Sequence, residues 1–383
     1  MELTRRKVAS ALAVGVVAPS LGGCSTMPST SAASVLVEAL AGKAVPGMTA
    51  VVIRDFSAEP ELVAGQRAAG TLEPVPSGAR WHLGSDGKAM TATMIARLVE
   101  AGALAWDRPL AQMLPDLAES MHPGYRDVTL PDMLSHHAGL PENTSDMDFF
   151  ATFYEDVAPT RSQRLRYITR CLGETPIGPA RAAPSYSNTG PLIAAVCAEQ
   201  ATGRSFESLI VSEVFAPLDM RSISFDQFGG PGEPLGHIDG RVANRPRDAN
   251  PPMFAPAGAM RLSMGDWARF CIDHMKGEHG RGRLLAADSY RFLHAPQRAS
   301  AEGGGWALGW GAAPHPMDLT GPALTHSGSD GNWYALVCLF PQTGNGVLVV
   351  SNAAESMAGD QSTLEAMRAL ARTVAAPITP STP

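Results

Sequence analysis

The sequence predicts one mixed α/β domain whose sheet is built from both chain ends, with a mainly helical region inserted between them. β-type apolar segments occur early, at Gly47–Arg54 and Leu62–Ala64, and again late, at Trp333–Phe340 and Gly346–Ser351. Helical runs separated by long Gly- and Pro-rich loops lie between them. The chain has 383 residues, of which 45% are hydrophobic, so one large domain or two interleaved ones can bury a sizeable core.

The elements follow in order. The strongest predicted helix is Leu83–Ala101, because Met90, Met94, Ile95 and Leu98 recur at intervals of three and four. The other predicted helices are Ser34–Leu40, Ser162–Leu172, Gly190–Gln200, Phe206–Phe215, Met264–Met275 and Gln361–Val374. We therefore expect the domain to span residues 34–375, with an α/β part at about 34–101 and 316–375 and the helical insert at about 102–315. The Pro-rich residues 376–383 are expected to be a disordered tail.

Residues 1–23 resemble a bacterial lipoprotein signal peptide. A basic start at residues 5–7 precedes an apolar run, Val8–Leu21, that is too short to span a bilayer as a helix. The run ends in Leu-Gly-Gly-Cys24, so Cys24 is the expected lipidation site and residues 24–33 the linker to a membrane anchor. We expect export to the periplasm or cell envelope. An ordinary secretory signal with an incidental cysteine is the alternative, and Arg5-Arg6 also permits twin-arginine export.

Composition excludes several classes of partner. The formal net charge is −7 and no basic block occurs, so nucleic acid is not an expected partner. A mean hydropathy of −0.03 argues against a polytopic membrane protein. Four further cysteines lack CxxC spacing and are expected to be buried thiols, although an oxidising compartment would permit a bridge; no metal site is expected. Oligomeric state is not predicted.

The helix at Leu83–Ala101 opens with Ser85 and, three residues later, Lys88. Residues at this spacing share a helix face, so the amine can reach the hydroxyl. A serine needs a neighbouring base to become a nucleophile, and a buried lysine with a lowered pKa can serve. The alternative is a capping serine followed by an exposed lysine.

Two further segments supply matching chemistry. Tyr186 and Asn188 lie two apart, hence on one side of an extended segment, where a phenol can move protons and an amide can hold a carbonyl. Further on, His326, Gly328 and Ser329 lie in a small-residue stretch against which a substrate can lie. An ordinary polar loop and a glycine-rich turn are the alternatives.

The order S-x-x-K, Y-x-N, H-x-G resembles the serine β-lactamase/penicillin-binding-protein superfamily. It is most similar to the class C β-lactamase-like branch, which includes family VIII carboxylesterases, D-alanyl-D-alanine carboxypeptidases and D-aminopeptidases. The resemblance extends from about residue 34 to 375 and includes segments at 81–92, 130–140, 257–270 and 308–311. It implies a β-lactamase/transpeptidase-like fold.

The resemblance also implies roles. Ser85 would be the acylated nucleophile, Lys88 its proton acceptor and Tyr186 the proton relay. Asn188 would hold the substrate's acyl amide, and the backbone N–H groups of Ser85 and Ser329 would form the oxyanion hole. No metal or organic cofactor is implied.

One departure bears on the substrate. Many β-lactamases carry lysine where this chain has His326, so a permanent cation for a substrate carboxylate is lacking unless another group, such as Arg261, replaces it. The first expectation is therefore a serine hydrolase acting on a small ester or amide. A D-alanyl-D-alanine carboxypeptidase or D-aminopeptidase acting on peptidoglycan-type substrates is the next alternative, then a β-lactamase. A silent β-lactam- or peptidoglycan-binding module is the non-enzyme alternative.

Overall fold

The computed structural model describes residues 32–378. The predicted signal peptide, Cys24 and most of the predicted linker lie outside the described residues, as do residues 379–383. Within the described part, no helix is both long enough and apolar enough to cross a membrane. Helix α1 (Ala32–Leu40) already includes the last two residues assigned to the linker.

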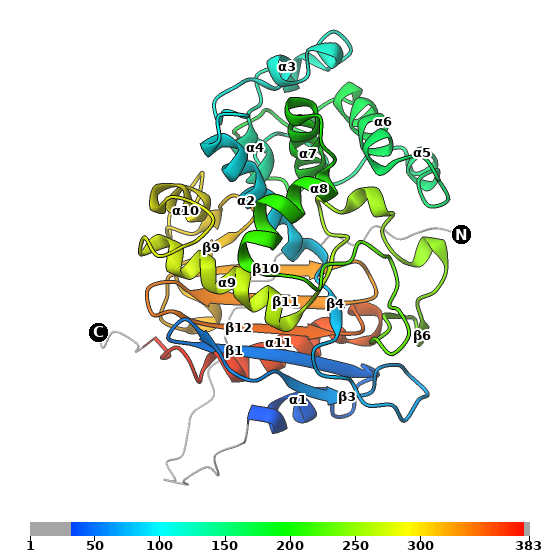
Figure 1. Cartoon of the computed structure of the whole chain (residues 1–383), viewed down its shortest axis with the longest axis vertical. Helices are drawn as coiled ribbons and strands as arrows, with labels where there is room; N and C mark the ends of the chain where they lie inside the picture. Colours follow the sequence, from blue (N-terminus) through cyan, green and yellow to red (C-terminus); the bar gives the residue numbers. More distant parts are fainter. Residues whose placement is uncertain (1–31, 379–383) are drawn as a thin grey trace. The chain divides into compact units, whose positions relative to one another are not determined.

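A single antiparallel sheet of eight strands dominates the fold, and both chain ends contribute to it, as predicted (Figure 1). The strand order is β2-β1-β12-β11-β10-β9-β8, and β3 also pairs with β1. The strands are β1 Gly47–Arg54, β2 Ser57–Ala58, β3 Leu62–Gly65, β8 Gly305–Trp306, β9 Gly311–Ala313, β10 Ala323–Ser329, β11 Tyr334–Phe340 and β12 Asn345–Ser351. In the centre, Val51 pairs with Leu348, and Val337 pairs with the same residue from the other side.

Helices cover both faces of the sheet (Figure 1). On one face, α1 and the C-terminal helix α11 (Gly359–Ala371) pack on β1, β11 and β12 around an apolar core that includes Leu36, Met48, Val349 and Met367. On the other face lies α9 (Met264–Glu278), which contacts β1 and β11. The sheet is therefore buried on both sides, which explains why β12 is buried at every position except its first residue.

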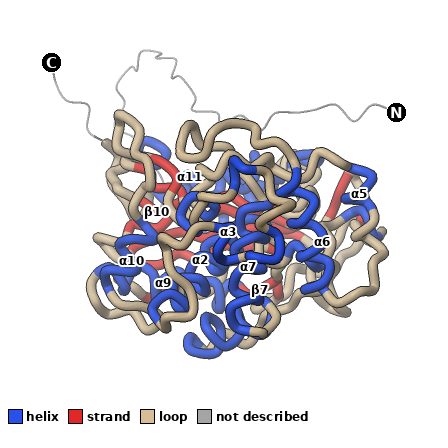
Figure 2. The backbone as a smooth tube through the Cα atoms, turned by 90° about the horizontal axis from the view of Figure 1, so that it is seen from above, coloured by secondary structure: helices blue, strands red, loops and turns tan. Residues whose placement is uncertain are grey.

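The region inserted between the two halves of the sheet is mainly helical, and α2 lies at its centre beside α7, α9 and α10 (Figure 2). Eleven of the fourteen residues of α2 are buried. The helices are α2 Gly87–Glu100, α3 Leu110–Met113, α4 Leu130–Leu134, α5 Met147–Ala151, α6 Thr160–Gly173, α7 Thr189–Thr202, α8 Phe206–Ile210, α9 and α10 Ala287–His294. All four cysteines in the described residues are buried free thiols.

Three details differ from the sequence predictions. Region 102–315 is not wholly helical, because β8 and β9 come from it and extend the main sheet; it also contains β5 (His237–Ile238), β6 (Arg241–Val242) and β7 (Arg261–Ser263). The predicted helix at 206–215 is divided into α8 and a π-helical turn. The first residues of the predicted disordered tail, 376–378, pair with residues 318–320, because their backbone groups find partners there.

Candidate active site

Ser85 lies in a tight turn between a strand and the central helix. Strand β4 (Arg80–His82) pairs with β7, and a 3-10 turn at Gly84–Asp86 then leads into α2. The predicted helix therefore begins at Gly87, with Ser85 in the turn just before it. Gly84 has a φ of +51°, a conformation that glycine adopts without steric cost. The turn leaves Ser85 half-buried among buried neighbours.

The amine of Lys88 is buried and close to the hydroxyl of Ser85. Its Nζ lies 2.8 Å from Ser85 Oγ, 2.8 Å from Asn188 Oδ1 and 2.6 Å from the carbonyl oxygen of Ala257. Burial lowers the pKa of Lys88 from 10.5 to about 7, against the opposing charges of Asp86 and Glu142. As a neutral amine, Lys88 would donate its two protons to Asn188 and Ala257 and accept the proton of Ser85. This is the geometry of a general base.

Tyr186 approaches the same oxygen from another side. Its hydroxyl lies 2.6 Å from Ser85 Oγ, and its ring lies 4.9 Å from Lys88 Nζ. Burial raises the pKa of Tyr186 above its ordinary value, so the phenol keeps its proton and donates to Ser85. Ser85 Oγ can therefore receive a hydrogen bond from Tyr186 while giving its own proton to Lys88.

Asn188 immediately precedes α7, and its amide is oriented by two partners. Its oxygen accepts a hydrogen bond from Lys88, and its Nδ2 donates to Asn143 Oδ1 at 3.2 Å. The nitrogen end of the amide thus points away from Lys88. Sequence reasoning missed Asn143, which lies in a loop without a periodic pattern.

Strand β10 forms the opposite wall of the site, and the predicted glycine-containing edge is a strand rather than a turn. It pairs with β11 as far as Ser329 but with β9 only as far as Thr325, so its other edge has no strand partner beyond that residue in the described chain. A Cβ on Gly328 would lie 1.9 Å from the Leu83 carbonyl oxygen and 2.8 Å from Ser85 N. Glycine is therefore required where the strand meets the nucleophile turn.

His326 is close to the site, and its side chain is buried beside Asp86. Its side chain is 2% exposed, and its Nδ1 lies 3.3 Å from Asp86 Oδ1. The alternative cation, Arg261, is also buried, where it pairs with Glu233 at 3.1 Å. The structure thus assigns both groups to contacts within the protein, and Arg261 is not a free cation for a substrate carboxylate.

His136 supports the Tyr186 segment, a role that the sequence did not reveal. Its backbone oxygen accepts the N–H of Ser185, and its ring Nδ1 accepts the N–H of Ser187 at 3.1 Å. The ring also contacts Tyr186 in a tilted arrangement, with 4.6 Å between ring centroids, and meets Trp306 edge-on at 4.7 Å. His136 has a φ of +64°, an uncommon conformation that these contacts hold in place.

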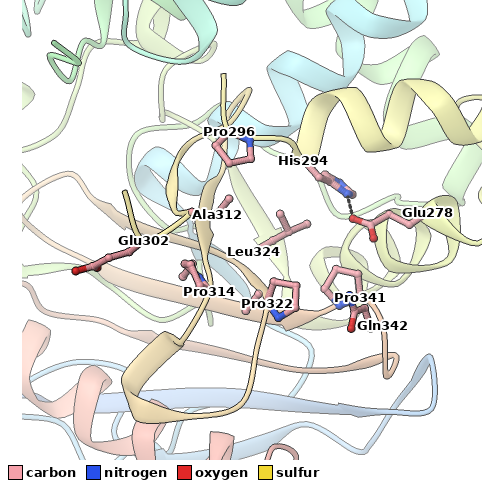
Figure 3. Close-up of a pocket in the computed structure, with 13 residues that line it drawn as sticks. Glu278, His294, Pro296, Glu302, Ala312, Pro314, Pro322, Leu324, Pro341 and Gln342 are labelled. Atoms are coloured by element: carbon pink, nitrogen blue, oxygen red, sulfur yellow. Dashed lines mark hydrogen bonds and ion pairs between the residues drawn. The ribbon is translucent and has the colours of Figure 1, made fainter. Parts of the chain in front are cut away.

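Two cavities lie near β10. One, of about 320 Å³, borders its open edge at His326 and Ser327 and is otherwise lined mainly by apolar side chains, including Trp306, Leu336 and Met367. The other, of about 340 Å³, is lined by none of the predicted site residues and has His294 and Glu278 at one end (Figure 3).

The second cavity is connected to α2 by a chain of hydrogen bonds. Glu278 bonds His294, whose Nε2 lies 2.9 Å from His274 Nδ1, and His274 Nε2 lies 2.9 Å from Thr93 Oγ1. Because Thr93 gives its hydroxyl proton to the Ala89 carbonyl, His274 must donate to Thr93 and accept from His294. His294 therefore donates to His274 through Nε2, and its Nδ1 contacts the Glu278 carboxyl group.

Comparison with known proteins gives a consistent result. The family model described as "Beta-lactamase" matches residues 32–372. Penicillin-binding protein 4 of Amycolatopsis lactamdurans is 26% identical over 318 residues, which cover 80% of this chain and 81% of that protein. The D-alanyl-D-alanine-carboxypeptidase/endopeptidase AmpH of Escherichia coli K12 is 22% identical over 81% of this chain and 80% of its own.

Solved structures with the same fold include three of different description. The octameric penicillin-binding protein homologue from Pyrococcus abyssi superposes with a TM-score of 0.75 at 22% identity, covering 89% of this chain and 76% of its own. A D-stereospecific amidohydrolase from Streptomyces superposes with a TM-score of 0.71 at 21% identity, covering 89% of this chain and 98% of its own. A class C β-lactamase from Rhodobacter sphaeroides also superposes with a TM-score of 0.71, at 19% identity, covering 89% of this chain and 98% of its own.

Proposed function

The chain belongs to the β-lactamase family and is a serine hydrolase, and we propose that it cleaves a small ester or amide through an acyl-enzyme on Ser85. One observation carries the proposal: Ser85 Oγ lies 2.8 Å from a buried amine, Lys88 Nζ, and 2.6 Å from a half-buried phenol, Tyr186 Oη. A proton acceptor and a proton donor therefore meet at one nucleophile.

The reaction follows from this geometry. In acylation, Lys88 takes the proton of Ser85 as Oγ attacks the substrate carbonyl carbon. The N–H groups of Ser85 and Ser329 hold the resulting oxyanion, and loss of one such donor typically costs about 3–4 kcal/mol. Tyr186 gives its proton to the departing alcohol or amine and regains one from Lys88. Water then attacks the acyl carbon and gives a proton to the same pair of residues, which return a proton to Ser85 Oγ as the acid is released.

The charges around the site favour substrates without a carboxylate next to the scissile bond. The charged groups that act on both Lys88 and Tyr186 are the carboxylates of Asp86 and Glu142. Arg261 is paired with Glu233 and His326 faces Asp86, so neither is free to bind a substrate carboxylate. The apolar cavity at the open edge of β10 is not lined by Ser85, Lys88 or Tyr186, so it would take only a part of a neutral ester or amide that extends along the strand.

A D-aminopeptidase-type activity is the second candidate. Glu142 is exposed, and its backbone oxygen accepts the N–H of Asn188 at 2.8 Å, which keeps its segment beside the site. Its carboxylate could pair with the ammonium group of an amino-acid amide or a peptidoglycan-type peptide. Relatives described as carboxypeptidase and D-stereospecific amidohydrolase support this second candidate.

We further propose that the protein is exported and attached to a bacterial membrane through a lipid on Cys24. The proposal rests on the basic start, the short apolar run and the Leu-Gly-Gly-Cys24 ending. Metabolic labelling with a radioactive fatty acid should mark the wild type and not Cys24→Ser. Equal labelling of both proteins would contradict lipidation at this cysteine.

The activity is tested by measuring kcat/KM for p-nitrophenyl butyrate, a D-alanine anilide and nitrocefin, with Ser85→Ala as the blank. We expect the ester or the anilide to be preferred over nitrocefin and all turnover to vanish in the variant. A preference for nitrocefin would make the protein a β-lactamase. Hydrolysis that survives in Ser85→Ala would refute the proposed nucleophile.

A further inference from the structure

Asp86 is a buried carboxylate directly beside the proposed nucleophile. Its side chain is 1% exposed, and neither of its oxygens has a hydrogen bond of normal geometry within the described residues. Burying an ionised carboxylate costs several kcal/mol unless a partner stabilises it. A stability argument alone would favour an apolar side chain at this position.

The partner of this carboxylate comes from strand β10. His326 Nδ1 lies 3.3 Å from Asp86 Oδ1 and 2.9 Å from the Ser327 carbonyl oxygen. Both neighbours are acceptors, so Nδ1 carries a hydrogen and points it toward them. The contact therefore joins the nucleophile turn to the strand that carries Ser329.

A second His–Asp contact crosses the same junction. His82 precedes the turn and Asp330 follows the strand, and their side chains approach to 3.6 Å while both are buried. Between the two contacts, a Cβ on Gly84 would lie 2.4 Å from Ser329 N. The two contacts thus bracket the place where the turn and the strand come closest, beside the two proposed oxyanion donors.

We propose that Asp86 is a positioning residue: its carboxylate holds His326, ties the nucleophile turn to β10, and places a fixed negative charge beside Lys88. This inference rests on the proposed acyl-enzyme function. The tie would set the spacing between the N–H groups of Ser85 and Ser329. The charge would set the pH at which Lys88 becomes a base, because a nearby anion favours the protonated amine.

The charge effect depends on the groups that surround the pair. The pKa of Asp86 is raised, because burial outweighs the neighbouring His326 and the charge of Lys88, which both lower it. Lys88 is faced by Asp86 and Glu142 and acts in turn on His136. Tyr186, Tyr334 and Cys271 also face Asp86, and burial raises the pKa of each, so all three stay neutral near pH 7.

The test is the rate at which a fluorophosphonate labels Ser85 between pH 5 and 9, which needs no knowledge of the natural substrate. Asp86→Asn keeps an oxygen for His326 and removes the charge. We expect this variant to be labelled at a rate close to that of the wild type at the optimum pH. On the acid side of the profile (the acid limb), the pH at which the labelling rate falls to half should be lower by about one unit. Asp273→Asn is the matched control, because Asp273 in α9 is a buried carboxylate that accepts a hydrogen bond from Tyr290 in α10, and the acid limb of this variant should not move.

The tie is tested separately with Asp86→Ala, His326→Ala and the double variant. Each single change should slow labelling at the optimum by about 10- to 100-fold, and the double variant should be no slower than the worse single one. An acid limb that stays at the wild-type pH in Asp86→Asn, or single losses that multiply in the double variant, would overturn the inference. If an alanine variant does not fold, the Asp86→Asn profile decides. A wild type whose Ser85 is not labelled would overturn the proposed function and, with it, this inference.

Discussion

Replacing Gly328 by alanine tests the contact between strand β10 and the nucleophile turn. The new Cβ would lie 1.9 Å from the Leu83 carbonyl oxygen and 2.8 Å from Ser85 N, both backbone atoms that cannot rotate away. An ordinary carbon–oxygen contact is about 3.5 Å, so the strand or the turn must move by more than about 1 Å. A displacement of this size at a catalytic centre costs about 100-fold, and loss of an oxyanion donor costs about 100- to 1,000-fold.

We therefore expect Gly328→Ala to lower kcat for p-nitrophenyl butyrate by at least about 100-fold. Gly178→Ala is the matched control, because nothing lies within 4 Å of a Cβ there and its φ is not positive. Thermal unfolding of both variants would separate a local displacement from loss of the fold. A Gly328→Ala enzyme within threefold of the wild type would refute the assignment of β10 as the wall of the site.

Three further predictions concern charges. First, kcat/KM should rise with pH around a midpoint near 7, because burial lowers the pKa of Lys88 to about 7 and only the neutral amine accepts a proton. An ordinary lysine would be only about 0.03% neutral at pH 7. A kcat/KM that keeps rising beyond pH 9 would therefore contradict this prediction. Second, Glu199→Gln should destabilise the fold by about 1–3 kcal/mol in urea unfolding, because the fully buried Arg164 loses the charge of its 2.5 Å partner and keeps only that of Glu207, and an unchanged stability would count against the pair. Third, Glu278→Gln should lower the free energy of unfolding by about 1–3 kcal/mol and leave kcat/KM unchanged. Glu278 begins the hydrogen-bond chain through His294 and His274, which reaches α2 at Thr93 rather than at Ser85. A large loss of activity would instead connect that chain to the reaction.

The features that were predicted from sequence are those set by local pattern. Strand β1 has the predicted bounds, and α2 follows the Met90–Met94–Leu98 spacing, because period and burial act over a few residues. Strands β8 and β9 were missed because they have only two and three residues, too few to show an alternating pattern. The division of 206–215 into an α-helix and a π-turn also depends on packing rather than on period.

The site shows the same limit. The sequence pointed to Ser85 with Lys88 and, separately, to Tyr186. The fold places Lys88 Nζ and Tyr186 Oη at 2.8 Å and 2.6 Å from Ser85 Oγ. The support of Asn188 by Asn143 and the Asp86–His326 contact could not be read from the sequence, because each joins segments that only the tertiary structure brings together. His326 was expected to face the substrate. In the structure it faces the carboxylate of Asp86, and no pattern in the sequence around Ser85 indicated a role for that residue.

The central claim is an acyl-enzyme on Ser85, and trapping it is the most direct test. Acid quenching during turnover of p-nitrophenyl butyrate, followed by peptide mass spectrometry, would locate the butyryl group. We expect the butyryl group on the peptide that contains Ser85 in the wild type, and no acylated peptide in Ser85→Ala. Turnover with the acyl group on another residue, or with no acylated peptide when hydrolysis is slowed at low pH, would contradict it.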